Sequence, residues 1–296
     1  MYAYILLIFV VIFYSGNILT GRAINELPPI TIAFFRLLVA FIALLPLGAR
    51  KAWKTRQLFF TYKKPFLLMT LTGITLFNTC IYGALQFSTA TRVSVLEAVI
   101  PVATALLSVW VLKERLIGIQ WVGVLLSFTG AVWVITEGDI FTLIQSWNTG
   151  DILMIGAILL WAVYSVNVKN YMHLFPSYAA VLVMTGISVI ALLPILLVEW
   201  ALVGVPYITT PGNMAGLLYL GIFPSFIALI LYNRAIDLLS ASKASVFLSF
   251  LPVVTMIGAA LWLGEKINSV QIIGALIVIG GVFLTNRPKK TKRSYS

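Results

Sequence analysis

The sequence predicts an all-α integral membrane protein with ten transmembrane helices, arranged as two inverted five-helix repeats. Of the 296 residues, 61% are hydrophobic and 10% are charged, and the mean hydropathy is +1.04. A soluble domain usually has about 25% charged residues, so the composition excludes one. Ten apolar stretches occupy most of the chain, and the second half of the sequence repeats the first.

Each stretch is about 20 mostly apolar residues long, the length that a bilayer-spanning helix requires. Within such a helix the backbone groups form hydrogen bonds with one another, as they must in lipid. The stretches cover residues 3 to 20, 30 to 48, 65 to 86, 92 to 112, 117 to 136, 151 to 169, 178 to 199, 213 to 233, 243 to 262 and 269 to 286. The first runs into polar Ser15 and Asn17 with no small-residue cleavage pattern. We interpret it as the first helix and expect no cleavable signal peptide.

The repeat is visible in two registers. The segment IALLP occurs at residues 42 to 46 and again at 190 to 194, a spacing of 148 residues that also relates Gly73 to Gly221. Further along, a spacing of 151 residues relates Pro101 to Pro252. Five crossings per copy place the second copy upside down, as in the inverted repeats of many secondary transporters. The predicted parts are a first repeat at 1–136, a second repeat at 151–286 and a basic cytoplasmic tail at 287–296.

Basic residues gather on one side of the predicted topology. With both termini inside, the inner side carries 16 of the 20 Lys and Arg residues, and the outer side carries Arg22, Arg92 and Lys266. The positive-inside rule therefore predicts a multi-pass protein of the cell (plasma) membrane with both termini cytoplasmic. We expect the segment from Arg50 to Lys64 and the basic tail to bind anionic lipid of the bilayer. The net charge of +11 is thereby explained without nucleic acid.

Two charged residues, Arg36 and Glu97, fall in the interior of predicted helices, away from their ends. A charge in the hydrocarbon costs at least about 2.5 to 3.5 kcal/mol, so such residues usually face a partner or a cavity. Arg36 lies about six residues into its helix and Glu97 about five, so at 1.5 Å per residue both lie roughly 8 to 9 Å below the outer boundary. We expect that they can form an ion pair. Polar side chains reach the same layer from neighbouring helices: Asn17, Asn78 and Tyr82.

This polar layer supports two interpretations that do not exclude each other. In a substrate chamber, Arg36 binds a carboxylate, Glu97 binds an ammonium group, and the amides orient the ligand. In a structural clamp, the ion pair joins two helices and the amides bond across the bundle. The repeat favours function, because Arg36 corresponds to Met184 and Glu97 to Leu248, so the charges occur once per molecule.

The second half offers aromatic and neutral groups instead, which either bind substrate or fill the core. Trp161 and Tyr164 are the main candidates, and Trp161 lies near mid-membrane, where an interfacial role does not explain it. Pro101 and Pro252 each remove one backbone hydrogen bond and are expected to bend equivalent helices. Paired interruptions point to a transport site, although kinks also serve packing. Glycines spaced seven apart predict close packing of the fifth and tenth helices: Gly123 with Gly130, and Gly274 with Gly281.

Catalytic, metal and redox chemistry find little support. Cys80 is the single cysteine, and the single histidine, His173, has no carboxylate cluster nearby, so we expect no disulfide, metal or cofactor. An intramembrane enzyme usually needs several carboxylates, a histidine or a metal cluster at the membrane face, and Glu97 is the only carboxylate in the interior of a predicted helix. We therefore expect no catalytic residues. A non-transporting receptor or scaffold would need a soluble sensor or effector segment, which the ten helices leave no room for.

The segments PVATALLSVWVLKERLIGIQWVGVLLSFTGAVWV (101–134) and PVVTMIGAALWLGEKINSVQIIGALIVIGGVFL (252–284) resemble the signature of EamA-type domains of the drug/metabolite transporter superfamily. The resemblance covers essentially the whole chain and includes an arginine in the second helix, Arg36. It implies a ten-helix transporter with both termini inside that moves small organic metabolites outward, commonly amino acids or related compounds. It also implies that helices five and ten lie at the periphery. Tyr14 stands where the family often has tryptophan, and Glu97 matches no family position.

We therefore expect an alternating-access carrier, monomeric or homodimeric, that exports a small polar or zwitterionic metabolite. If Arg36 holds Glu97 as its counter-ion, the carboxylate is a poor proton carrier, and facilitated diffusion follows. If Glu97 is unpaired and desolvated, the chain is instead a proton-coupled drug or metabolite antiporter.

Overall fold

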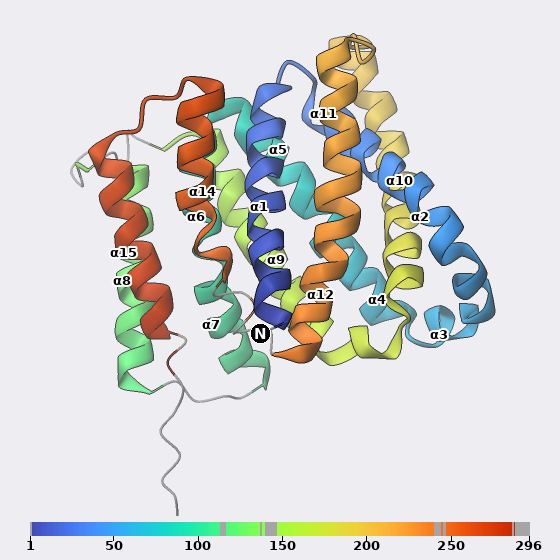
Figure 1. Cartoon of the computed structure of the whole chain (residues 1–296), viewed down its shortest axis with the longest axis horizontal. Coiled ribbons are helices and arrows are strands. Elements are labelled where there is room, and N and C mark those ends of the chain that lie inside the picture. The colour runs from blue at the N-terminus through green and yellow to red at the C-terminus, as the bar shows by residue number, and fades with distance from the viewer. Residues whose placement is uncertain are drawn as a thin grey trace, which may run out of the picture.

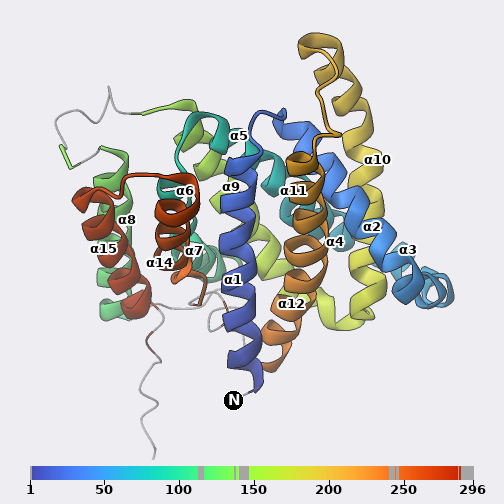
Figure 2. The ribbon, with the colours of Figure 1, turned by 45° about the horizontal axis from the view of Figure 1, so that its top comes forward.

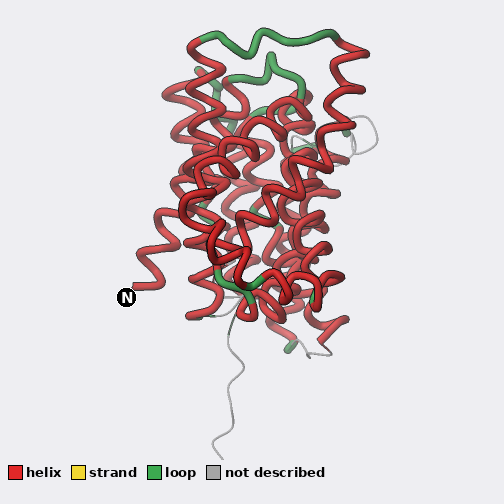
Figure 3. The backbone as a smooth tube through the Cα atoms, turned by 90° about the vertical axis from the view of Figure 1, so that its right-hand side faces the viewer, coloured by secondary structure: helices red, strands yellow, loops and turns green. Residues whose placement is uncertain are grey.

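The structure is a computed structural model that describes residues 2–112, 117–136, 138–139, 147–239, 244, 247–285 and 287. These residues form helices and connecting loops, with no strand among them. The helices run side by side along one axis, and the loops lie mainly at the two ends of the bundle (Figure 3). Glu114, several inner basic residues and the tail from 288 onward lie outside the described residues.

The first half forms a series of helices, two of which are interrupted. Its elements are α1 (Tyr2–Ala23), α2 (Pro29–Lys54), α3 (Arg56–Thr61), α4 (Lys63–Met69), η1 (Thr70–Leu76), α5 (Phe77–Phe87), α6 (Ala90–Glu97), α7 (Ile100–Leu112) and α8 (Gly118–Ile135). The π-helical segment η1 joins α4 to α5 without a break. A two-residue turn at 98–99 separates α6 from α7.

The second half has a similar order of elements. They are α9 (Thr149–Tyr171), η3 (Met172–Leu174), α10 (Ser177–Val203), α11 (Pro211–Ile222), η4 (Phe223–Ala228), α12 (Leu229–Leu238), α14 (Leu251–Gly258), η5 (Ala259–Leu263) and α15 (Ser269–Thr285). Local sequence explains where several begin. Asn148 caps α9, since its Oδ1 accepts a hydrogen bond from Asp151 N at 3.1 Å. Pro211 is the first residue of α11, a position whose N–H would have no partner within the helix, so proline loses no hydrogen bond there.

The chain is a multi-pass membrane protein by the length and composition of its helices. Among the described residues, seven helices are long and apolar enough to cross a bilayer: Tyr2–Ala23, Pro29–Lys54, Lys63–Phe87, Ala90–Val111, Thr149–Leu174, Ser177–Val203 and Pro211–Leu238. Each coincides with a predicted stretch. The other three predicted stretches coincide with shorter apolar helices: Gly118–Val134, Leu251–Leu263 and Ser269–Thr285. The stretch at 243 to 262 lies partly outside the described residues.

Helices of the two halves pack against each other throughout the bundle. α2 packs on α10 at one edge and α8 packs on α15 at the opposite edge, while α1 runs between them beside α14, α11 and α12 (Figures 1 and 2). We call the end with the α1–α2 loop the upper end, as drawn in Figure 1, and the opposite end the lower end.

The α8–α15 pair confirms the predicted glycine packing. A Cβ atom on Gly123 would lie 2.5 Å from the carbonyl oxygen of Gly281, and one on Gly274 would lie 2.1 Å from Val134 Cγ2. Ser127 Oγ also donates a hydrogen bond to Val278 O at 3.2 Å. The two backbones can approach this closely only because glycine has no side chain.

Both prolines stand where an interrupted helix begins again. Pro101 is the second residue of α7 and Pro252 the second residue of α14, and each follows a two-residue turn, at 98–99 and 249–250. Proline has no N–H, and its ring clashes with the carbonyl group four residues earlier, here that of Glu97 or Leu248, so the helix is interrupted between the two residues. Three further interruptions were not predicted: the π-helical segments η1, η4 and η5. η1 and η4 occur in the third stretch of each half, whereas η5 lies at the end of the stretch at 243 to 262.

Candidate functional site

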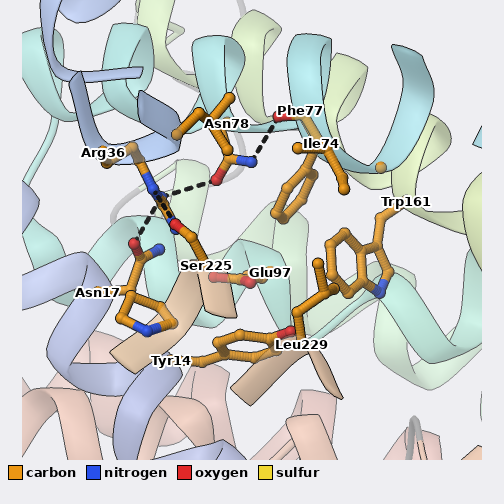
Figure 4. Close-up of a pocket in the computed structure, with 13 residues that line it drawn as sticks. Tyr14, Asn17, Arg36, Ile74, Phe77, Asn78, Glu97, Trp161, Ser225 and Leu229 are labelled. Carbon is orange, nitrogen blue, oxygen red and sulfur yellow. Dashed lines mark hydrogen bonds between the residues drawn. The ribbon is translucent and has the colours of Figure 1, made fainter. Parts of the chain in front are cut away.

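A small cavity lies inside the bundle at the interface between the two halves (Figure 4). Its lining residues come from α1, α2, η1, α5, α6, α9, η4 and α12: Tyr14, Asn17, Arg36, Leu37, Gly73, Ile74, Phe77, Asn78, Glu97, Trp161, Pro224, Ser225 and Leu229. Its volume is about 30 Å³, and one water molecule needs about 10–15 Å³ on this scale. The cavity therefore has room for one or two water molecules and is closed to a metabolite.

Arg36 is held by four neutral side chains from three other helical segments. Its Nε donates to Ser225 Oγ at 2.7 Å, and its Nη1 donates to Asn17 Oδ1 and Asn78 Oδ1, both at 2.8 Å, and to the hydroxyl of Tyr82. The guanidinium is 5.2 Å from the centroid of the Tyr82 ring, a cation–π distance. Nη2 donates to none of the described residues. The Nη2 edge of the guanidinium can therefore bind a group in the cavity.

The acceptors around Arg36 are themselves fixed. Asn78 Nδ2 donates to Ile74 O at 2.6 Å, which turns the Asn78 oxygen toward Arg36. The Ser225 hydroxyl donates to Leu220 O at 2.7 Å and so presents its lone pairs to Arg36 Nε. Tyr82 Oη donates to Asn17 Oδ1 at 2.7 Å. The guanidinium thus occupies a preorganised cradle.

Glu97 is the last residue of α6, directly before the helix break, and it is 5% exposed. Its carboxylate lies between Ser225 and Tyr14 in Figure 4. Oε2 is buried without a hydrogen-bond partner, and within the described structure Glu97 forms no ion pair. The predicted Arg36–Glu97 ion pair is therefore wrong. Equal depth does not make two side chains meet, and the neutral acceptors already occupy the Arg36 positions that bond to protein.

An aromatic wall closes the lower side of the cavity. The Trp161 ring lies 4.4 Å from that of Phe77, 5.0 Å from Tyr164, 5.8 Å from Tyr232 and 6.1 Å from Tyr14, between centroids. Such distances are typical of attractive aromatic pairs. The wall gives an apolar surface beside the two charged groups.

Gly73 of η1 allows one member of this wall to reach its place. A Cβ atom there would lie 2.2 Å from Tyr164 Cδ2, so no other residue leaves room for the tyrosine ring. Tyr164 Oη then donates a hydrogen bond to Asn233 Oδ1 at 3.1 Å. π-Helical turns often occur at functional sites, and both η1 and η4 contribute cavity-lining residues.

The structure gathers five of the seven residues predicted to bind substrate around one cavity: Asn17, Arg36, Asn78, Glu97 and Trp161. The other two lie just behind it, Tyr82 bonded to Arg36 and Tyr164 bonded to Asn233. Neither predicted kink residue lines the cavity, although Glu97 lies four positions before Pro101.

Sequence reasoning missed several lining residues, chiefly Phe77, Ser225 and Leu229. Ser225 follows Pro224, and this pair within an apolar stretch was an available sign of an interrupted helix. Phe77 and Leu229 resemble any other core residue in the sequence.

Carboxylates of the second half bind helix starts of the first half at the upper end. Glu265, which follows η5, accepts hydrogen bonds from Ala90 N at 3.0 Å, Thr91 N at 3.3 Å and Thr91 Oγ1 at 3.0 Å in the first turn of α6. A negative charge there is stabilised by free N–H groups and the helix dipole.

Glu199 of α10 makes the same kind of contact with α2. It accepts hydrogen bonds from Ile30 N at 2.9 Å, Thr31 N at 2.8 Å and Thr31 Oγ1 at 2.7 Å. In addition, Arg92 and Asp151 form a buried bidentate ion pair, with distances of 2.9 Å (Nε–Oδ1) and 2.7 Å (Nη2–Oδ2). The upper end of the bundle is therefore closed by polar contacts between the halves.

Comparison with known proteins gives a consistent result. The model of the EamA-like transporter family matches residues 1–136 and 148–287. An uncharacterized transporter of Archaeoglobus fulgidus is 29% identical over 287 residues, which cover 95% of this chain and 96% of the relative. A protein of Streptantibioticus cattleyicolor named "Probable terminal-alkyne amino-acid exporter" is 27% identical, covering 85% of this chain and 82% of the relative. A solved crystal structure has the same fold, with a TM-score of 0.68, 15% identity and 96% of both chains covered.

Proposed function

This chain belongs to the EamA-like transporter family, and from that premise we propose that it is a secondary transporter that exports small organic metabolites across the cell membrane by alternating access. The observation that carries the proposal is the small cavity at the interface of the two halves, with Arg36 and Glu97 in its lining. The names of its relatives fit a transporter rather than an enzyme.

The substrates we propose are amino acids and related zwitterions. The unoccupied Nη2 of Arg36 suits a carboxylate, the unpaired Oε2 of Glu97 suits an ammonium group, and the aromatic wall at Trp161 suits an apolar side chain. The relative named as an amino-acid exporter supports both the substrate class and the direction.

In the topology we propose, the chain crosses the membrane ten times as two inverted five-helix repeats, at 1–136 and 151–286, and both termini are cytoplasmic. The three shorter apolar helices then span the bilayer together with the seven long ones. Corresponding interruptions support the repeat: the breaks before Pro101 and Pro252, and the segments η1 and η4. In this orientation the upper end faces outside, and the basic residues gather at the inner side.

The inner corner formed by the end of α2, α3 and the start of α4 is the surface we propose for anionic lipid. At this corner Trp53 is 72% exposed and Phe60 is 74% exposed, and basic residues lie near them in the sequence. A groove of about 490 Å³ beside α3 is lined by apolar groups and by Lys63 and Lys64. Aromatic rings and lysines together suit the boundary between lipid tails and phosphate groups.

The deciding experiment is counterflow of radiolabelled amino acids into liposomes that contain the purified full chain. We expect exchange of at least one amino acid by wild type and a loss of at least tenfold in Arg36→Ala. A screen of cells that overexpress the chain, challenged with toxic metabolites, identifies the substrates to label. If Arg36→Ala shows the same counterflow as wild type, Arg36 does not bind substrate. If wild type shows no counterflow with any amino acid of the panel, the proposal of a transporter is refuted.

The unpaired state of Glu97 favours a second candidate, proton-coupled antiport, over facilitated diffusion. A carboxyl group that has no counter-ion is free to exchange a proton during the cycle, whereas one held by Arg36 is not. If antiport is right, a pH gradient drives accumulation in wild-type liposomes, and Glu97→Gln abolishes this drive while exchange at equal pH persists. If uptake by wild type does not depend on the pH gradient, proton-coupled antiport is wrong and facilitated diffusion is the mechanism.

A further inference from the structure

A group of buried polar side chains lies below the cavity, and the proposed function gives its polar atoms no role. We call it the lower polar cluster: Trp161, Tyr164 and Ser165 of α9 with Tyr232 and Asn233 of α12. Each of these residues is at most 4% exposed. Trp161, Tyr164 and Tyr232 also belong to the aromatic wall, and Trp161 lines the cavity.

Most polar atoms of the cluster have no partner. The hydrogen bond from Tyr164 Oη to Asn233 Oδ1 is satisfied, but Trp161 Nε1, Ser165 Oγ, Tyr232 Oη and Asn233 Nδ2 are buried without one. The Tyr232 hydroxyl faces Trp161 and Ser165 but bonds to neither with acceptable geometry. An unmade hydrogen bond at a buried group is unfavourable, and apolar residues of the same shape would avoid it. In this conformation the cluster therefore gains less from hydrogen bonding than its polar atoms allow.

The internal repeat relates this cluster to the cradle of Arg36. In the 148-residue register Ser165 corresponds to Asn17, and in the 151-residue register Asn233 corresponds to Tyr82. Tyr82 lies five residues before the upper end of its helix at Phe87, and Asn233 lies five residues before the lower end of its helix at Leu238. The two polar groups thus occupy matching depths from opposite ends of the bundle. The second lacks a charged residue because Met184 stands where Arg36 would be repeated.

We propose that the lower polar cluster is a second, uncharged substrate subsite, which binds the hydroxyl or amide groups of a substrate when the lower end opens. The proposal rests on the proposed function of transport. A substrate coming from inside first meets neutral donors and acceptors at Ser165, Tyr232 and Asn233, and then passes Trp161 to reach Arg36 and Glu97. The unpartnered atoms are the groups that hydrate or bind ligand in the inward-open conformation.

One test needs no knowledge of the substrate. Cys80 is the single cysteine, so Ser165→Cys is made in a Cys80→Ala background and exposed to a charged methanethiosulfonate reagent in inside-out vesicles. The control is Ser188→Cys, because Ser188 is also 0% exposed but its hydroxyl bonds to Thr75 at 2.8 Å. We expect Ser165→Cys to react at least tenfold faster than the control. Equal rates would mean that water does not reach the cluster from the inner side, and the proposal would be wrong.

A second test measures binding through transport. Ser165→Ala and Tyr232→Phe each remove a hydroxyl without a partner, so the melting temperature of the purified chain stays the same or rises. Counterflow of radiolabelled serine or glutamine is expected to fall about fivefold, the loss of one neutral hydrogen bond, while that of valine changes less than twofold. Ser88→Ala is the matched control, because Ser88 Oγ is likewise buried and unpartnered but lies after α5 at the upper end.

The two arms separate failure of the subsite from failure of the function. Wild-type exchange of serine or glutamine with unchanged rates in both variants overturns the subsite and leaves the transporter intact. If wild type exchanges none of the three amino acids, the proposed substrate class is refuted and the subsite for it falls as well. The cysteine result still reports whether a water path reaches Ser165.

Discussion

Glu265→Gln removes the charge from the contact between the end of η5 and the start of α6. The carboxylate accepts hydrogen bonds from Ala90 N, Thr91 N and Thr91 Oγ1. A hydrogen bond to a charged group contributes about 1.5–3 kcal/mol, against about 0.5–1.5 kcal/mol for a neutral one. Glutamine keeps one oxygen acceptor but turns an NH2 group toward the remaining donors. Allowing for solvent at this half-buried residue, we expect the contact to weaken by about 2 kcal/mol.

This contact closes the upper end over α6, the helix that carries Glu97. If an outward-open state requires α6 and η5 to separate, weakening the contact by about 2 kcal/mol raises the population of that state about 30-fold. The open population is measured with Leu229→Cys in a Cys80→Ala background, since Leu229 lines the cavity and is 5% exposed. In right-side-out vesicles, a membrane-impermeant thiol reagent should then label the cysteine at position 229 about 30-fold faster in the Glu265→Gln protein than in the protein that keeps Glu265.

Glu199→Gln is the control with the same chemistry in a different place. It also weakens a carboxylate contact with a helix start, but α2 and α10 touch along their length, with close approaches at Gly48 and Tyr178 and at Phe41 and Gly186. We expect a lower melting temperature and an unchanged labelling rate. Equal labelling of wild type, Glu265→Gln and Glu199→Gln would refute the argument that the Glu265 contact holds the upper end shut.

Three further substitutions test the site and the packing around it. Arg36→Lys loses the guanidinium nitrogens that bond to four side chains, so counterflow should fall at least tenfold; a smaller loss would leave only the charge as important. Gly73→Ala brings a Cβ to 2.2 Å from Tyr164, about 1.3 Å inside a normal contact of ~3.5 Å, and should destabilise the chain by about 1–3 kcal/mol; an unchanged melting curve would contradict the close approach. Asp151→Ala removes the carboxylate that neutralises buried Arg92 and should cost about 3–5 kcal/mol, most of which the double substitution Arg92→Met with Asp151→Leu should restore in a denaturation assay.

The position of the helices could be predicted because hydrophobicity is a local property of the sequence. A run of apolar residues marks a helix in lipid whatever it packs against. The ends were less predictable: α2 extends to Lys54 beyond the apolar stretch that ended at 48, because basic residues can continue a helix outside the hydrocarbon. Of the π-helical segments, η4 contains Pro224, a local sign of an interruption, whereas η1 has no such sign. Tyr164 packs over Gly73 of η1, and this contact joins residues far apart in the sequence.

Several residues that line the cavity could be predicted from the sequence, but the hydrogen bonds between them could not. Arg36 and Glu97 are conspicuous in the sequence because charges are rare in apolar helices. Their depth follows from counting residues, whereas the direction of each side chain depends on the rotation of its helix about its own axis. For this reason the expected ion pair does not form, and Arg36 bonds to Ser225, a residue 189 positions away in the other half.

The small volume of the cavity has a consequence for the energy supply of the cell. A space of about 30 Å³ holds too few water molecules to make a continuous hydrogen-bonded chain between the two sides of the membrane. Among the described residues, the cavity therefore offers no continuous row of water molecules to a proton in this conformation. In this conformation the cavity thus gives the ion gradients of a cell no path along which to dissipate.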